Sequence, residues 1–108
     1  MNIDLTQCSD QELAALADTR GDEVCREFLR RYKAGVYRLI VKQIGDADEA
    51  LDLTQETFIS GLAALGRFDG DRPFRAWIAR IALNKCRDWA RRRKVRAFFS
   101  RAPPLQSA

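Results

Sequence analysis

Apolar side chains recur at every fourth position from Val24 to Ile44, and this spacing is the strongest constraint on how the chain folds. Because an α-helix advances by about 100° per residue, such positions line one face of a helix. The stripe consists of Val24, Phe28, Tyr32, Val36, Ile40 and Ile44. Asp22 is assigned as the N-cap and Gly45 as the stop. The segment is therefore predicted to be one long amphipathic helix.

Three further helices are predicted, and no stretch shows the alternation of a half-buried strand. A short helix over residues 9–20 opens with the capping-box pair Ser9 and Glu12. Longer helices are predicted over 47–65, after the cap Asp46, and from Pro73 to about Arg93. The inner face of the 47–65 helix is assigned to Leu51, Thr54, Phe58, Leu62 and Leu65. The expected fold is all-α, a compact bundle of three long helices and one short N-terminal helix.

The composition argues against several classes of function. The chain has 108 residues, no histidine and three widely spaced cysteines, Cys8, Cys25 and Cys86. This pattern predicts no disulfide framework, metal site or cofactor, and no catalytic constellation is visible, so the protein is not expected to be an enzyme. No apolar run reaches the roughly 20 residues of a membrane span, and the N-terminus lacks the pattern of a secretory signal. We therefore expect a cytoplasmic protein.

Charge is distributed unevenly along the chain. Residues 1–65 carry 7 Lys/Arg against 12 Asp/Glu, whereas residues 66–108 carry 12 Lys/Arg against 3 Asp/Glu. Such asymmetry indicates two surfaces with different partners, the basic one suited to a polyanion.

The helix predicted after Pro73 has two chemically different faces. Its core side is assigned to Phe74, Ile78, Ile81, Ala82, Cys86 and Trp89. The opposite stripe consists of Trp77, Arg80, Asn84, Arg87 and Arg91, with Lys85 beside it and Arg92, Arg93, Lys94 and Arg96 beyond it. Guanidinium groups bind phosphates, an Asn amide can pair with an adenine edge, and a Trp ring can stack on an unpaired base. The stripe therefore fits nucleic acid, although a solvated helix face and a core role for Trp77 remain alternatives.

The helix predicted over 47–65 carries an acidic outer face. It consists of Asp48, Asp52, Gln55, Glu56 and Ile59. Carboxylates around an exposed Ile suit a protein partner that presents Arg or Lys around an apolar contact, and an ordinary solvated face is the alternative.

Two segments together resemble region 2 of the extracytoplasmic-function (ECF) sigma factors of the sigma-70 family. The first is the Asp52-Leu53-Thr54-Gln55-Glu56-Thr57-Phe58 heptapeptide, and the second is Pro73-Phe74-Arg75-Ala76-Trp77-Ile78-Ala79-Arg80-Ile81-Ala82-Leu83-Asn84, with Phe68 in the loop between them. The resemblance covers roughly residues 9–95. It implies a transcription initiation domain over 1–95 that binds core RNA polymerase and the −10 promoter element, followed by a tail or interdomain linker over 96–108.

The resemblance also implies roles for residues. The acidic face, with Asp52, Gln55 and Glu56, would contact the clamp helices of the β′ subunit. The loop from Gly66 to Arg72 would hold a base flipped from the non-template strand, with Phe68 either lining that pocket or anchoring the loop. Arg72, Trp77, Arg80, Asn84, Lys85, Arg87 and Arg91 complete the expected DNA-binding set. The implied mechanism is capture of the melted strand, with an anti-sigma factor as a further partner.

One departure from the family concerns region 4, the second helical domain of these sigma factors. Nothing after Arg93 is expected to supply it, so the chain is expected to be an excised domain or a naturally short protein. Two rival readings remain. A helix-turn-helix module would place the Arg80 and Asn84 helix in an intact major groove. A membrane-docking module would use the basic tail from Arg91 to Arg101 with Phe98 and Phe99 as anchors.

Overall fold

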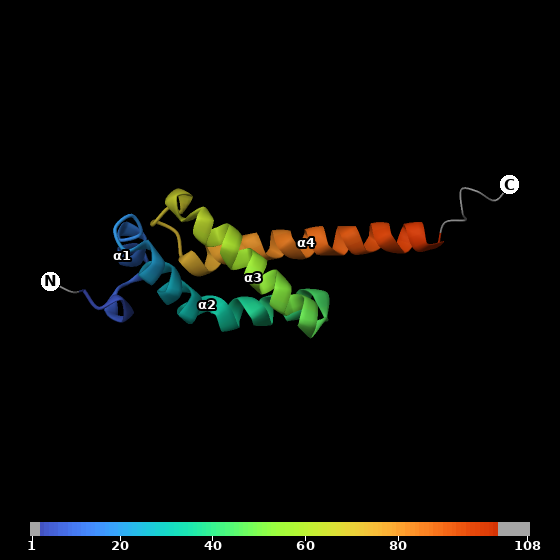
Figure 1. Ribbon diagram of the computed structural model, residues 1–108, viewed down its shortest axis with the longest axis horizontal. Coiled ribbons are helices and arrows are strands. Elements are labelled where there is room, and N and C mark those ends of the chain that lie inside the picture. The colour runs from blue at the N-terminus through green and yellow to red at the C-terminus, as the bar shows by residue number, and fades with distance from the viewer. Residues whose placement is uncertain (1–2, 102–108) are drawn as a thin grey trace.

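The computed structural model describes residues 3–101, and all the regular structure in that range is helical. The elements in order are η1 (Leu5–Gln7), α1 (Asp10–Ala15), α2 (Gly21–Ile44), α3 (Ala47–Ala63), η2 (Leu65–Arg67) and α4 (Phe74–Arg101), where η denotes a short 3-10 turn. The predicted all-α bundle of three long helices and one short helix is confirmed (Figure 1).

The three long helices pack against one another pairwise, and α3 crosses the other two obliquely (Figure 1). The core is centred on Phe28 of α2 and Phe74 at the start of α4, whose rings stack with centroids 4.0 Å apart. Four members of the predicted α2 stripe, Val24, Phe28, Val36 and Ile40, are buried, and Tyr32 and Ile44 are half-buried. The four-residue spacing therefore identified the central helix and its buried side correctly.

Capping explains where the helices begin and end. Ser9 and Glu12 form the predicted capping box, with Ser9 Oγ accepting from the Glu12 amide at 3.1 Å. α1 is shorter than predicted, because it ends at Ala15 and the chain continues to α2 in turns. Asp22 does not cap α2: Arg20 occupies that position without a side-chain cap, and Asp22 lies in the first turn.

The connection between α2 and α3 follows the prediction. Gly45 ends α2 at φ 72°, in the left-handed region that glycine adopts without strain. Asp46 caps α3 by accepting from the Glu49 amide at 3.1 Å.

The predicted inner face of α3 needs correction. Leu51 is 51% exposed, Leu62 is only half-buried, and Leu65 is buried in η2 after α3 has ended. The buried side of α3 consists of Ala50, Leu53, Thr54, Thr57, Phe58 and Gly61. Because α3 packs on two helices at once, small residues occupy its closest contacts, and hydrophobic spacing alone does not identify them.

Helix α4 is longer than predicted. Its core side is buried as expected, except that Ile81 is half-buried. The helix continues past Arg93 to Arg101, so residues 96–101 are helical where a tail or linker was expected. Residues 91–101 are all exposed. The segment lacks Gly and Pro and is rich in Arg, which has a high helix propensity. The rest of the predicted tail, 102–108, lies outside the described residues.

Candidate protein and nucleic-acid interfaces

The acidic outer face of α3 is present as predicted. All five of its members, Asp48, Asp52, Gln55, Glu56 and Ile59, are exposed, and Ile59 is 71% exposed. With the 51% exposed Leu51 beside them, they combine negative charge with apolar surface. This composition fits a protein partner that carries both positive charge and an apolar contact. We call this surface the acidic face.

The buried half of the same segment holds the acidic face in place. Leu53, Thr54, Thr57 and Phe58 point into the protein between the outward-facing residues. The buried hydroxyls of Thr54 and Thr57 donate to the carbonyls of Ala50 and Leu53, at 2.6 and 2.7 Å. These bonds satisfy the polar atoms within the helix itself, so a buried Thr costs little here.

A groove between α2 and α3 adjoins the acidic face, and sequence spacing did not reveal it. The cavity has a volume of about 600 Å³. Its lining consists of Arg26, Leu29, Arg30, Lys33, Ala34, Tyr37, Leu51, Thr54 and Gln55. Leu29 and Tyr37 are half-buried residues of α2 that pack beside its core stripe. The sequence feature that could have indicated the groove is the spacing of three basic residues, Arg26, Arg30 and Lys33, which places them on one face of α2.

The outer stripe of α4 is exposed at Arg80, Asn84, Arg87 and Arg91, and Lys85 beside it is half-buried. Arg87 Nη1 donates to Asn84 Oδ1 over 3.5 Å, which leaves the Asn84 amide nitrogen to donate outward. Arg91 Nη2 lies 2.8 Å from Asp88 Oδ1, in an exposed ion pair of small energetic value. We call Arg80, Asn84, Lys85, Arg87 and Arg91 the basic face.

The two aromatic residues predicted to meet DNA differ in exposure. Phe68 is buried, at 9% exposure, with its ring centroid 5.6 Å from that of Phe74 and 5.4 Å from that of Trp77. This placement supports the anchoring role for Phe68 over a direct contact with a base. Trp77 is half-buried and covers Gly61 of α3, so it combines the core role with a partly open edge.

The loop predicted from Gly66 to Arg72 starts inside η2, so the irregular loop between η2 and α4 comprises residues 68–73. It is held by its own hydrogen bonds and by a contact from α1. The Arg72 amide donates to the Asp69 carbonyl at 3.1 Å, and the Asp71 amide donates to Asp69 Oδ1 at 3.0 Å. Gln11 Nε2 of α1 donates to the Gly70 carbonyl. The Arg72 side chain is exposed. The loop therefore has a defined turn with its basic residue directed to solvent.

The residues described include no cluster of His, Cys, Asp and Glu that would hold a metal ion. Among the same residues, no helix is long and apolar enough to cross a membrane. The cysteines are unpaired: Cys86 is buried, and Cys8 and Cys25 are half-buried. Burial raises the pKa of the Cys86 thiol, which disfavours a reactive thiolate.

Comparison with known sequences identifies the domain. The family described as Sigma-70 region 2 matches residues 28–96. RNA polymerase sigma-H factor of Pseudomonas aeruginosa is 41% identical over 85 residues, which cover 78% of this chain and 44% of that protein. ECF RNA polymerase sigma factor SigW of Bacillus subtilis is 38% identical over 63 residues, which cover 58% of this chain and 34% of that protein. The chain thus spans less than half the length of these relatives.

Two solved structures have the same fold. The first is the NMR structure of an engineered region 2 of sigmaE in complex with GTAAAA, with a TM-score of 0.75 and 28% identity over 83% of this chain and 94% of that one. The second is CnrH in complex with the cytosolic domain of CnrY, with a TM-score of 0.66 and 35% identity over 73% of this chain and 51% of that one.

The chain therefore belongs to the sigma-70 family, as a region 2 domain. Its relatives are bacterial RNA polymerase sigma factors, and those named ECF sigma factors assign it to the ECF group.

Proposed function

We propose that this domain docks on core RNA polymerase through the acidic face and holds the melted −10 non-template strand with the basic face and the loop of residues 68–73. The observation that carries the proposal is the outward chemistry of the two family segments. The first presents carboxylates on α3 beside the exposed Ile59, and the second presents guanidinium and amide groups on α4.

The polymerase contact rests on charge and apolar surface together. Asp52, Gln55 and Glu56 face solvent from a helix whose other side is buried, so little backbone order has to be gained on binding. Ile59 supplies the apolar contact that charge pairs alone lack. The family's expected partner is the pair of β′ clamp helices.

The DNA contact rests on the basic face. Arg80, Arg87 and Arg91 can neutralise phosphates, while Asn84, oriented by Arg87, can read a base edge. Arg72 and the partly open edge of Trp77 lie where the loop meets α4. A domain that binds only the single strand shifts the promoter toward its open state without any covalent step. No cofactor is needed, and the site of action would be the cytoplasm.

Control by a second protein is part of the proposal. CnrH, which shares this fold, is bound in its structure to the cytosolic domain of CnrY. We propose that an anti-sigma factor likewise restrains this domain by covering a surface that polymerase needs.

Titration of the labelled chain with core RNA polymerase tests the docking step. Glu56→Arg is expected to weaken binding by about 10- to 100-fold, because a charge reversal repels the basic partner and leaves it unpaired. Asp18→Arg, a reversal at an exposed turn residue outside the acidic face, is the matched control and should bind normally. Equal affinity of Glu56→Arg and the wild-type chain would contradict the acidic face as the dock.

Competition between single-stranded and duplex −10 DNA tests the second step. The capture mechanism predicts tighter binding to the single strand. A helix-turn-helix mode of binding predicts the reverse. A strong preference for duplex would therefore replace the proposed mechanism with major-groove recognition.

A further inference from the structure

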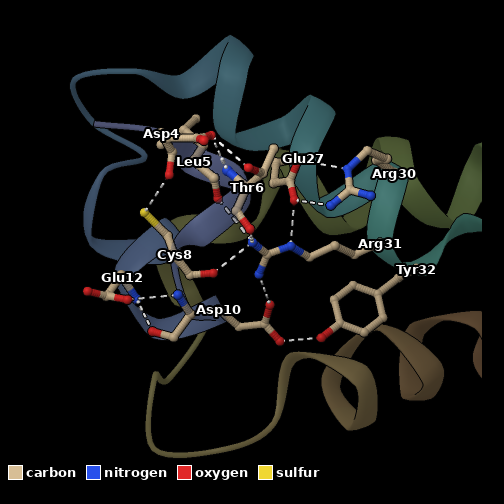
Figure 2. Close-up of polar contacts among 11 residues, drawn as sticks. Asp4, Leu5, Thr6, Cys8, Asp10, Glu12, Glu27, Arg30, Arg31 and Tyr32 are labelled. Carbon is tan, nitrogen blue, oxygen red and sulfur yellow. Dashed lines mark hydrogen bonds and ion pairs between the residues drawn. The ribbon is translucent and has the colours of Figure 1, made fainter. Parts of the chain in front are cut away.

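The N-terminal segment, residues 4–15, is attached to α2 by a polar network centred on Arg31 (Figure 2). Arg31 Nη2 donates to the carbonyls of Leu5 and Cys8 at 3.0 and 2.7 Å. Its Nη1 lies 3.0 Å from Asp10 Oδ1, and its Nε lies 2.7 Å from Glu27 Oε2. One guanidinium thus binds backbone and side chain from η1, α1 and α2 together, which a lysine ammonium cannot reproduce.

Glu27 keeps this network charged. Its side chain is 7% exposed and also accepts from Arg30 at 2.6 and 2.9 Å. The hydrogen bonds from Arg30 and then Arg31 outweigh the effect of burial and lower the pKa of Glu27 to about 2. The carboxylate therefore remains ionised throughout the physiological range, and Arg31 keeps its partner.

Asp10 extends the network to the start of α4. While Oδ1 pairs with Arg31, Oδ2 accepts from the hydroxyl of Tyr32, as Figure 2 shows. The Tyr32 ring centroid lies 5.2 Å from that of Phe74, the first residue of α4. Burial, together with the bond to Asp10, raises the pKa of Tyr32 to about 12, so the hydroxyl remains a donor.

The next residue, Gln11, contacts the loop between η2 and α4 directly. Its side-chain nitrogen donates to the carbonyl of Gly70. Residues on both sides of this contact line a cavity of about 290 Å³: Ser9, Asp10 and Gln11 from the N-terminal segment, and Asp71, Arg72, Pro73 and Phe74 from the loop and α4. The N-terminal segment therefore lies directly against the loop, on the residues that follow the Phe68 anchor.

We propose that the N-terminal segment, held by Arg31, fixes the 68–73 loop in its base-binding conformation through Gln11, so that Gln11 and Arg31 are positioning residues for promoter recognition. This inference rests on the proposed function. A loop that is ordered before binding loses less conformational entropy when it encloses a flipped base. The specificity of the loop for one base also depends on a fixed loop conformation, because a displaced hydrogen-bond donor no longer discriminates against the wrong base.

The test is sequence selection from a random single-stranded DNA pool, followed by sequencing, with the full chain as wild type, Gln11→Ala and Gln43→Ala. Gln43 is an exposed glutamine near the end of α2, and that end lies away from the loop (Figure 1), so Gln43 serves as the matched control. We expect Gln11→Ala to reduce base discrimination about 2- to 10-fold at the one position bound by the loop, the size of effect from loss of a single hydrogen bond. Discrimination at the other positions and affinity for core polymerase should stay unchanged.

The outcomes separate the two proposals. If the wild-type chain enriches no sequence, the proposed promoter reading itself fails. If the wild type is selective and Gln11→Ala selects the same sequences equally well, the positioning role is wrong while the proposed function stands.

Hydrogen exchange provides an independent readout of the loop. Amides of residues 67–72 are expected to exchange faster in Gln11→Ala and in Arg31→Lys than in Gln43→Ala. Circular dichroism melting identifies any variant that fails to fold. Unchanged loop exchange in a folded Gln11→Ala variant would overturn the inference.

Discussion

The outer faces of α3 and α4 differ sharply, although the two helices share one core. On α3, three carboxylates and Gln55 share the exposed side with Ile59, whereas the corresponding surface of α4 carries three arginines, Lys85 and Asn84. Beneath them, each helix buries an apolar side against α2 and against the other helix. The bundle thus provides one rigid support for two surfaces of opposite charge.

Each of the two family segments contains buried residues that pack in the core and exposed residues that are available to a partner. In the α3 segment, Leu53, Thr54, Thr57 and Phe58 are buried and Asp52, Gln55 and Glu56 are exposed. In the α4 segment, Phe74, Ile78 and Ala82 are buried, and Arg80 and Asn84 are exposed. Substitutions on the buried side should therefore affect both partners, and substitutions on the exposed side only one.

The largest effect should come from the shared contact at Gly61, where α3 meets α4. Even a methyl group there would come within 2.5 Å of Ile78 Cδ1 and 3.7 Å of Trp77 Cζ3. Gly61→Leu should lower the free energy of unfolding by about 3 kcal/mol through overpacking, and weaken binding of polymerase and DNA alike. Urea unfolding measures the loss.

Gly35 supplies the control, because it is exposed in α2 and a methyl group there would meet only Arg38 Nη2, at 3.9 Å. Gly35→Ala should raise the free energy of unfolding by about 0.5–1 kcal/mol through helix propensity. If Gly61→Leu abolished the binding of only one partner, the two faces would not share their support.

Acidification should lower the stability of the helical bundle that carries both the acidic face and the basic face. The Glu27 carboxyl has a lower pKa folded than unfolded, so its stabilisation is complete above pH ~5 and is lost as pH falls toward 2. Between pH 6 and pH 3 this group should account for a loss on the order of 2 kcal/mol in the free energy of unfolding. Urea unfolding across this range measures it. Glu27→Gln should be less stable at neutral pH and should not show the loss of about 2 kcal/mol between pH 6 and pH 3. If the variant lost as much stability on acidification as the wild type, the pairing of Glu27 with Arg30 and Arg31 would be contradicted.

The smallest effects distinguish two contacts within the basic face. Asn84→Ala should remove about 1 kcal/mol of discrimination at one base, since it removes a base-edge contact. Arg87→Ala should weaken all single-stranded sequences by about 1 kcal/mol and reduce the salt slope of the binding constant by about 0.7, as loss of one phosphate contact does. Fluorescence anisotropy at several salt concentrations measures both. A sequence-dependent loss in Arg87→Ala would indicate that Arg87 acts mainly through its 3.5 Å bond to Asn84.

Much of the fold was predictable because it depends on neighbours in sequence. The capping box at Ser9, the stop at Gly45 and the cap at Asp46 each involve residues within four positions. Helical periodicity also placed the charged side chains of α3 and α4 correctly, and all five predicted members of the acidic face are exposed. Their assignment to polymerase and DNA remains a prediction.

The sequence by itself determined the helices, the core stripe of α2 and the two charged faces, since periodicity and capping act over a few residues. Only the tertiary structure decided which side of α3 is buried, how Phe68 anchors the loop and how the N-terminal segment is attached. Arg31 lies 26 residues from Leu5, and Gln11 lies 59 residues from Gly70. Contacts over such separations depend on the packing of all three long helices at once, because packing alone brings these groups within hydrogen-bonding distance.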